Sequence, residues 1–341
     1  MKNTKKSIKA KRTFLIVLIV VLAVIFAALV AGVAYVENLL GLINKNPDDS
    51  IMSDSEYQDF LNDQTETIDP NFSGEKLDPD DVDWDVHEGD VVNKKHIVNI
   101  LLIGQDRRPG EGRQRSDVML LCTVNTKTKE LTLTSFMRDM YVPIPGYDDN
   151  RINACYAFAG MKLLNKCLEQ NFAIHVDGNI EVDFDGFKGI IDLMGGVDIY
   201  LSNSEANSLI AQGYAANAGM CHLNGEAALA YSRNRSIGNG DFSRTERQRK
   251  VINALLEKCK GMSVSQLNGL MEQALPMITT DLSTREMLNY ITQLVPMLSG
   301  MKVSTQQIPA DDTFKYAYIR NMSVLVPDLA KNREIMQNIM D

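Results

Sequence analysis

The strongest constraint on the fold is an uncharged apolar stretch near the N-terminus, residues 13–36, whose centre reads FLIVLIVVLAVIFAALV. As a helix it would be about 36 Å long, enough to cross the hydrocarbon of a bilayer. The preceding residues 1–12 contain several lysines and Arg12 but no acid. This tail is therefore expected to stay cytoplasmic. We predict a single-pass anchor in the cell membrane with an extracytoplasmic C-terminal domain.

A cleaved signal peptide is the competing interpretation of the same stretch. The stretch is longer than the usual apolar core of a signal peptide, and the small residues near Ala31 and Ala34 make only a weak cleavage site. Under either interpretation the bulk of the chain lies outside the cytoplasm.

Charge, cysteine and histidine content indicate which partners, disulfides and metal sites this external part can have. The formal net charge is -9, whereas nucleic-acid-binding domains are usually basic, so no nucleic acid partner is expected. An odd number of cysteines leaves at least one thiol free. A Cys155–Cys221 disulfide and fully reduced, buried thiols both remain open. With four scattered histidines, a zinc site is not expected.

Composition divides the chain into five segments. The basic tail (1–12) and the apolar stretch (13–36) precede an acidic segment, 37–95. Between residues 48 and 90 Lys76 is the only lysine or arginine. Such an acidic segment cannot easily offset its ordering entropy by burial, so an extended linker is predicted. Residues 96–310 follow as a folded domain, and 311–341 as a C-terminal tail or helix.

Alternating elements within 96–310 indicate an α/β domain. Short apolar runs predict strands at 97–103, 118–124, 131–136, 197–201 and 302–308, and an extended segment at 173–184. Helices are predicted at 151–171, 187–193, 226–232, 244–260, 264–278 and 284–298.

Charged residues flank the first three predicted strands. Asp106 follows the first strand and Asp117 precedes the second, so pairing as a hairpin would bring both to one end. The third strand reverses again and returns Arg138 to that end. Close carboxylates repel unless one is protonated or a cation lies between them, and oxygen ligands favour a hard ion such as Mg²⁺. Structural carboxylates at loop ends are also common, so the pair alone does not establish a metal site.

A second group of charges is the arginine-rich run that follows Ser232, namely Arg233, Arg235, Arg244, Arg247 and Arg249. Guanidinium groups of this kind bind phosphate or carboxylate. The alternative is a basic surface loop that pairs with the acidic linker.

Helical spacing separates these arginines. Ser243 and Glu246 form a capping box that predicts a helix from Arg244. The apolar stripe through Val251, Ile252 and Leu255 continues back to Gln248 and Arg244. An inward arginine at a helix N-terminus needs an anionic partner. Arg249 and Lys250 fall on the outer face, where we predict solvated charges.

The order of motifs resembles that of the LytR-CpsA-Psr family, also called cell envelope-related transcriptional attenuators. The motifs cover about residues 96–260 and comprise NILLIGQDR (99–107), RSD (115–117), SFMRD (135–139), RINACY (151–156), VDFDGF (182–187), DLMGGVD (192–198), LNGEAAL (223–229) and SRNR (232–235), followed by Arg247-Gln248.

The resemblance implies a type II membrane protein with an α/β/α sandwich around a mixed central sheet. It implies a phosphotransferase that moves a glycopolymer, such as teichoic acid or capsule-like polysaccharide, from undecaprenyl pyrophosphate to peptidoglycan. Asp106 and Asp117 would hold Mg²⁺. The pyrophosphate would be bound by Arg115, Arg138, Arg233, Arg235, Arg244 and Gln248. Arg138, Asp117 and Asp139 would be catalytic, and Asp241 would orient an arginine.

Two departures from the family pattern stand out. The usual Ile-Pro-Arg-Asp is Phe136-Met-Arg-Asp139 here, which removes a rigid proline. Cys155 and Cys221 stand where small apolar residues are expected. A lipid carrier also needs an apolar groove, for which the Met-rich helices at 261–301 are candidates, although core packing is their commoner role. A polyprenyl pyrophosphate hydrolase and a non-enzymatic envelope sensor are alternative functions.

Overall fold

The computed structural model describes residues 34–45, 47–62, 74–87, 93–105 and 112–341, together with the single residues 32, 89, 91 and 107. Most of the predicted span at 13–36 and the candidate ligand Asp106 lie outside the described residues. Within the described part of the chain, no helix combines the length and apolarity needed to cross a bilayer.

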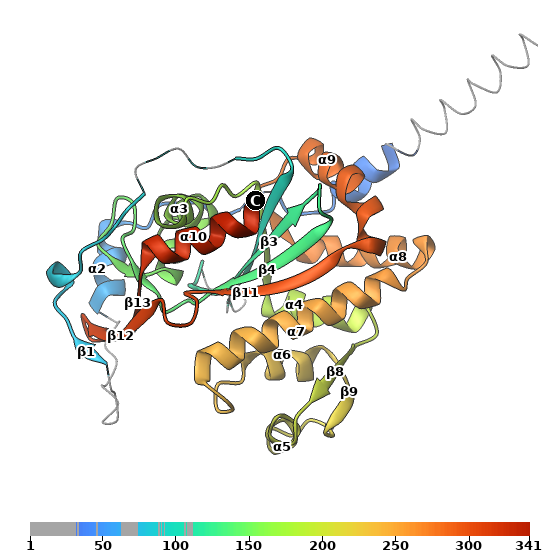
Figure 1. Cartoon of the computed structure of the whole chain (residues 1–341). Coiled ribbons are helices and arrows are strands. Elements are labelled where there is room, and N and C mark those ends of the chain that lie inside the picture. The colour runs from blue at the N-terminus through green and yellow to red at the C-terminus, as the bar shows by residue number, and fades with distance from the viewer. Residues whose placement is uncertain are drawn as a thin grey trace, which may run out of the picture.

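A six-stranded mixed sheet forms the centre of the molecule (Figure 1). Its order is β10 (Thr279–Thr280), β7 (Gly178–Asp183), β2 (Ile97–Gln105), β3 (Ser116–Asn125), β4 (Glu130–Phe136) and β11 (Lys302–Ile308). The pairs β2–β3 and β3–β4 are antiparallel, whereas β7 and β11 run parallel to their neighbours β2 and β4. The predicted α/β fold with a mixed sheet is confirmed.

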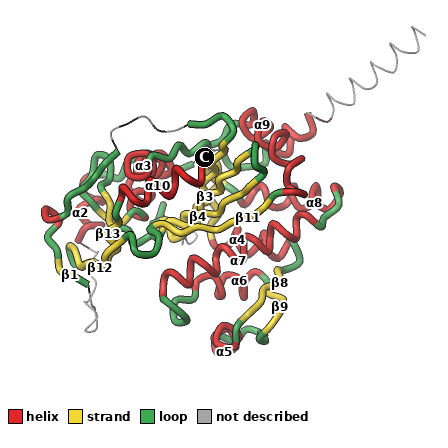
Figure 2. The backbone as a smooth tube through the Cα atoms, in the orientation of Figure 1, coloured by secondary structure: helices red, strands yellow, loops and turns green. Residues whose placement is uncertain are grey.

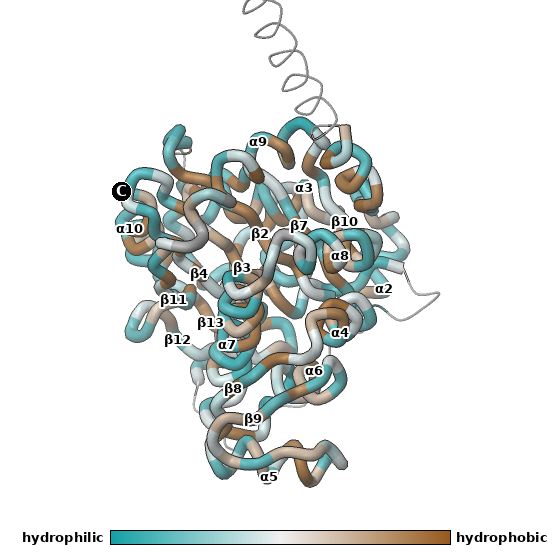
Figure 3. Tube along the Cα trace, turned by 90° about the vertical axis from the view of Figure 1, so that its right-hand side faces the viewer, coloured by the Kyte–Doolittle hydropathy of each residue, from teal (hydrophilic) through white to brown (hydrophobic). Residues whose placement is uncertain are grey.

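Helices cover both faces of this sheet. On one face, α3 (Asn153–Phe172) and α10 (Leu329–Met340) bury Leu101, Ile103, Met119 and Leu121. On the other, α7 (Gly240–Lys260) and α9 (Thr284–Leu294) pack on Val98, Leu120 and Leu133. The smaller helices α4 (Phe184–Leu193), α6 (Gly225–Arg233) and α8 (Val264–Ala274) complete that layer. Figure 3 shows hydrophobic residues along the strands and along the helices that cover them.

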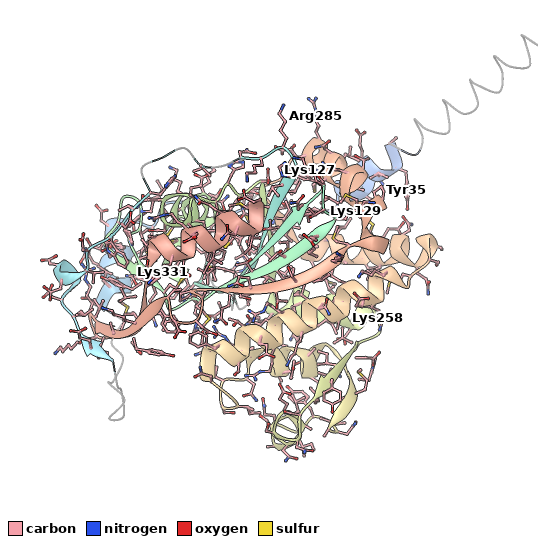
Figure 4. All side chains as sticks on the ribbon, viewed as in Figure 1. Tyr35, Lys127, Lys129, Lys258, Arg285 and Lys331 are labelled. Carbon is pink, nitrogen blue, oxygen red and sulfur yellow. The ribbon has the colours of Figure 1, made fainter. Side chains whose placement is uncertain are left out.

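A small lobe projects beyond α6 and α7 (Figure 2). It consists of the antiparallel strands β8 (Val197–Leu201) and β9 (Gly219–Leu223) with α5 (Asn203–Ala211) between them. Lys258, labelled in Figure 4, donates from α7 to the carbonyls of Gly195 and Gly196 at 3.1 and 2.6 Å. This contact fixes the start of β8 against α7.

The C-terminal residues form a second sheet and a helix. Strands β12 (Phe314–Ile319) and β13 (Met322–Pro327) pair as an antiparallel hairpin, and β1 (Glu75–Lys76) joins β12 in parallel. Short strands β5 (Tyr141–Val142) and β6 (Asn150–Arg151) pair beside this sheet. Sequence reasoning gave no role to the hairpin.

The acidic segment that we expect to be a linker is partly folded onto the domain. Its helix α2 (Asp54–Asn62) places Tyr57 and Phe60 edge-on against Phe158 of α3, with centroids 5.1 and 5.0 Å apart. A short 3₁₀ turn, η1 (Pro79–Asp81), precedes Trp84, whose indole donates to Asp149 at 2.6 Å. A few aromatic residues therefore order part of a segment that is otherwise acidic.

The last residues of the predicted span and those that follow it are also docked. Residues 34–40 are helical, and Leu39, Leu40 and Ile43 are buried. Leu40 and Ile43 pack against Leu282 and Met287 of the α9 region. Tyr35, labelled in Figure 4, donates to side chains of α8, including Asn268 at 2.7 Å.

Residues 48–52 fit into a kink of α3. Gly160 adopts a φ of 65° in this kink, and a Cβ there would lie 2.5 Å from the carbonyl oxygen of Asp48. Arg113 donates to the carbonyls of Asp48 and Ser50 at 2.6 and 2.7 Å. The positive φ and the close backbone approach both require glycine here.

Candidate functional site

An apolar cavity of about 430 Å³ lies between the sheet and helices α4, α6 and α7. The strands contribute Leu102, Val118, Leu120, Ile180 and Val182, and the helices contribute Phe184, Phe187, Ile190, Leu229, Ile252 and Leu255. This volume is in the range of small-ligand sites. The lining is suited to a hydrocarbon chain.

Polar side chains gather at one end of this cavity. They are Asp117, Asp183, Ser232, Arg233, Arg235, Arg244 and Gln248. The strand register explains why Asp117 lies at this end, because Gln105 at the end of β2 pairs with Ser116 at the start of β3. The N-terminal turns of α7 and the end of α6 supply the arginines. One ligand can therefore contact an apolar wall and a cationic group together.

Arg138 lies close to three carboxylates of this charged group. Its Nη1 donates to Asp117 Oδ1 at 2.6 Å, and its Nε lies 3.5 Å from Asp139 Oδ2 and 3.6 Å from Asp241 Oδ2. Asp241 also binds Arg244 at 2.6 Å and Arg235 at 3.5 Å. We call Asp117, Arg138, Asp139, Arg235, Asp241 and Arg244 the charged cluster. Three separate stretches of sequence meet in it.

Neighbouring charges within the charged cluster shift the pKa values of Asp117 and Arg138. Burial opposes the charge of Asp117, but Arg138, with Arg244 and Arg235, outweighs burial and holds the pKa of Asp117 below its usual value. Burial likewise opposes the charge of Arg138, yet Asp139, Asp117 and Asp241 raise its pKa. Both groups are therefore ionised at neutral pH.

Asp139 and Arg244 are shifted in the opposite sense. Burial, reinforced by Asp241, raises the pKa of Asp139 against the influence of Arg138 and Arg151. Burial and the neighbouring Arg138 lower the pKa of Arg244 to about 10, so it remains a cation at neutral pH. Arg244 is 2% exposed, and its Nε makes no hydrogen bond to any residue that the structure describes. Arg244 thus retains a donor for an anion.

The start of α7 differs from the predicted capping box. The helix begins at Gly240, one turn earlier than expected, so that Asp241 and Phe242 lie in its first turn. Ser243 Oγ accepts from the backbone N–H of Asn239 at 2.8 Å, and Asn239 itself provides no side-chain cap. The capping interpretation was therefore wrong, although Arg244 and Gln248 do face inward.

Other candidate residues lie nearby with different contacts. Arg233 lies over the ring of Phe184 at 4.4 Å and lines the cavity. Arg115 instead lies over the ring of Phe60 in α2 at 4.4 Å. Gln248 donates to the carbonyl of Ser232 at 3.5 Å. The structure therefore places Arg115 against α2 and the other two at the cavity.

Of the predicted metal ligands Asp106 and Asp117, only Asp117 is among the described residues. Asp117 presents an ionised carboxylate, 27% exposed, at the end of the cavity. Asp106 lies outside the described residues, and its neighbour Arg107 is 3.7 Å from Asp183. In the described ranges no three His, Cys, Asp or Glu side chains are arranged to hold a metal ion. Of the predicted pair, the structure therefore describes only Asp117, whose Oδ1 is paired with Arg138.

One expectation about other residues is wrong, and two questions that the sequence left open are addressed by the structure. Arg249 is only partly exposed, and its Nη1 is buried without a hydrogen bond within the described residues, so it is not a solvated charge. Cys155 and Cys221 are free thiols in separate apolar clusters and form no disulfide. Among the side chains that the structure describes, none from the Met-rich stretch 261–301 lines the apolar cavity, whose walls come from the sheet and from α4, α6 and α7.

Two arginines near the charged cluster were named in the sequence motifs but were given no role in the site. Arg151 is 6% exposed and lies 3.5 Å from Asp139. Arg247 is buried, donates to the carbonyls of Asn234 and Ile237, and so supports the turn between α6 and α7. Arg151 opens one of the ordered motifs, and this was the available signal for it.

The amino-acid sequence is similar to those of known teichoic acid transferases. The chain is 37% identical over 179 residues to "Polyisoprenyl-teichoic acid--peptidoglycan teichoic acid transferase TagU" of Bacillus mycoides (strain KBAB4), covering 52% of this chain and 57% of that protein. It is 30% identical over 260 residues to the TagV transferase of that title from Bacillus subtilis (strain 168), covering 73% and 66%. The chain therefore spans little more than half the length of the TagU relative.

Solved structures share the fold. The crystal structure of Bacillus subtilis TagV aligns with a TM-score of 0.59 and 29% identity over 72% of this chain and 98% of that one. A structure titled "TagT bound to LI-WTA" aligns with a TM-score of 0.59 and 26% identity over 72% and 90%. The model of the LytR_cpsA_psr family matches residues 54–340. The chain therefore belongs to the LytR_cpsA_psr family.

Proposed function

We propose that this protein is a phosphotransferase that moves a glycopolymer from a polyprenyl pyrophosphate carrier, undecaprenyl pyrophosphate, to peptidoglycan. The observation that carries the proposal is the apolar cavity, which ends at the charged cluster. A polyprenyl pyrophosphate has the same division, with a hydrocarbon chain joined to a diphosphate. The hydrocarbon chain enters the cavity, and the diphosphate meets the arginines.

The relatives support this assignment. TagU and TagV are named as transferases that use polyisoprenyl-linked teichoic acid and peptidoglycan, and TagT has been solved with LI-WTA. The names suggest the same classes of donor and acceptor for this chain. The particular glycopolymer is a further question for experiment.

The reaction is an in-line displacement at the phosphorus that bears the glycan. An acceptor hydroxyl of peptidoglycan forms the new P–O bond, and the P–O bond to the lipid phosphate breaks. Arg138, Arg244 and Arg235 stabilise charge on the non-bridging oxygens and on the departing lipid monophosphate. Arg233 and Gln248 hold the diphosphate at the cavity, while Arg115 contributes from the α2 side.

A carboxylate accepts the proton of the acceptor hydroxyl. Asp139 suits this role better than Asp117, because its raised pKa is closer to neutrality. Asp117 suits the role of an anionic ligand, since its lowered pKa keeps it charged. The proposed Mg²⁺ would be held by Asp117 with Asp106 and would neutralise charge on the diphosphate.

The proposed location is the cell membrane. A single-pass anchor at 13–36 would leave the catalytic domain extracytoplasmic, on the side where peptidoglycan is assembled. The acidic net charge of -9 agrees with a partner that is not nucleic acid.

A direct test supplies the purified extracytoplasmic part with lipid-linked glycan, Mg²⁺ and peptidoglycan oligomers. The expected product is a glycan joined to peptidoglycan through a phosphodiester, detected by mass spectrometry. Release of glycan phosphate without coupling would instead identify a hydrolase. Tight donor binding with neither product would identify a sensor. Either of these two results would overturn the transferase.

A further inference from the structure

A second cavity, of about 360 Å³, also borders the charged cluster. Its polar wall contains Arg138, Asp139 and Arg151, and Arg235 lines both this cavity and the apolar one. The two cavities therefore meet at the charged cluster. The wall of the apolar cavity consists mostly of aliphatic and aromatic side chains. The wall of the second cavity combines charged side chains with aromatic rings.

The aromatic wall comes from two distant parts of the chain. Phe242 of α7 stacks on Phe314 of β12, with centroids 5.5 Å apart and an angle of 27°. Phe314 meets Tyr316 edge-on at 5.3 Å. Phe242 and Tyr316 line the cavity, and Tyr316 is 44% exposed. An aromatic surface is therefore open beside the charged groups.

Backbone contacts hold this wall against the charged cluster. Phe242 directly follows Asp241 in the first turn of α7. The backbone N–H of Leu325, which pairs with Tyr316 in the hairpin, donates to the carbonyl of Asp139 at 2.9 Å. The C-terminal hairpin is thus attached to the loop that carries Arg138 and Asp139.

We infer that this second cavity binds the acceptor sugar of peptidoglycan, an inference that rests on the proposed transferase function. In-line displacement requires the attacking hydroxyl to approach opposite the leaving group. The lipid phosphate leaves on the side of the apolar cavity, so the acceptor enters from the opposite side. Arg138 bridges the two linings: its Nη1 binds Asp117, which lines the apolar cavity, and its Nε faces Asp139 and Asp241, which line the second one.

The chemistry of the wall fits a sugar ring. A hexose has a face of C–H groups that packs on an aromatic ring and a rim of hydroxyls that binds charged groups. Tyr316 and Phe242 offer the aromatic surface, and Asp139 and Arg151 offer the polar partners. The acceptor hydroxyl gives its proton to Asp139 as the new P–O bond forms and the lipid phosphate departs.

The test compares Tyr316→Ala with Tyr316→Phe in the transfer assay. Tyr316→Ala is expected to raise the KM for peptidoglycan oligomers about tenfold, equivalent to about 1.4 kcal/mol of binding, with no change in the KM for the lipid-linked donor. Tyr316→Phe keeps the ring and is expected to restore most of the acceptor affinity. Tyr200→Ala is the matched control, because Tyr200 is 70% exposed on β8 and lines neither cavity.

The two KM values distinguish the peptidoglycan acceptor from the donor glycan as the occupant of the cavity. A raised KM for the donor, with the acceptor unchanged, would show that the donor glycan occupies the cavity and would overturn the inference. An unchanged KM for both substrates in Tyr316→Ala would also overturn it.

Direct titration separates this inference from the transferase itself. Calorimetry follows binding of a peptidoglycan disaccharide repeat to the wild-type protein and to Tyr316→Ala. If the wild-type protein makes no coupled product but binds the disaccharide through Tyr316, the proposed function fails while sugar binding at this cavity stands. If it transfers glycan and the two proteins bind the disaccharide equally, only the inference fails.

Discussion

Where β2 and β3 border the apolar cavity, side chains that face α3 and α10 are fully buried, whereas Leu102 and Val118 on the opposite face are only partly covered; Leu120 and Val98 on that opposite face are buried. Leu101 and Met119 face α3 and α10 with exposures of 0% and 1%. Leu102 and Val118, one position away in each strand, are partly buried and line the apolar cavity. One alternating pattern thus builds a closed core on one face and an open binding surface on the other.

The difference shows where stability and function are separated in this fold. A closed face gains the full free energy of apolar burial. An open face gives up part of it and keeps a surface for a ligand. Substitutions on the two faces should therefore affect different measurements, and four predictions examine that division.

The largest effect is expected for Leu101→Ala on the closed face. It should lower the free energy of unfolding by about 3 to 5 kcal/mol, because a fully buried leucine leaves a cavity. Urea unfolding measures the loss. Leu102→Ala is the matched control and should cost about 1 to 2 kcal/mol while weakening donor binding. Equal losses of stability in both variants would contradict the division.

Arg138→Lys tests the charged end of the open face. A lysine keeps the charge but cannot reach Asp117, Asp139 and Asp241 together, so turnover should fall about a hundredfold, or about 2.7 kcal/mol. Transfer assays measure this. Arg285→Lys, at an exposed position labelled in Figure 4, is the control and should be active. Full activity of Arg138→Lys would show that the planar guanidinium is dispensable.

Val118→Phe fills the apolar cavity from its sheet side. The larger ring should weaken donor binding about tenfold, or about 1.4 kcal/mol, with little loss of folding stability because it projects into open space. Fluorescence titration with a polyprenyl phosphate measures the affinity. Met119→Phe on the closed face should instead destabilise the fold by overpacking. Unchanged donor affinity for Val118→Phe would place the lipid elsewhere.

The smallest effect concerns acid stability. Because the pKa of Asp117 is lowered in the folded state, its stabilising contribution is present above its ordinary pKa of 3.8 and is lost as pH falls through the lowered value. We expect less than about 1 kcal/mol, since the pair with Arg138 is partly exposed. Acid unfolding below pH 3.8 should therefore be steeper for the wild-type protein than for Asp117→Asn. Identical acid curves would show that the pair adds no stability.

Much of the open face was predictable from sequence. Apolar runs gave the central strands, hairpin reversal brought Asp117 to Arg138, and helical spacing turned Arg244 and Gln248 inward. These predictions depend on local periods of two and 3.6 residues, which the chain alone specifies. The exact start of α7 was missed because Ser243 caps nothing and instead accepts from Asn239.

Contacts between distant segments were not predictable in this way. Phe60 and Trp84 are aromatic residues in an acidic segment, and their partners lie far along the chain. The wall formed by Phe242 and Tyr316 similarly depends on where the C-terminal hairpin docks. Composition describes such segments on average, whereas a few apolar side chains decide whether they are ordered.

The buried positions of Leu39, Leu40 and Ile43 bear on how the protein reaches its substrate. With the anchor that we propose at 13–36, almost no free chain separates the membrane from the folded body. The catalytic domain would then stand at a fixed height and orientation above the lipid surface instead of swinging on a tether. A carrier lipid would have to rise out of its leaflet along one defined route to enter the enzyme.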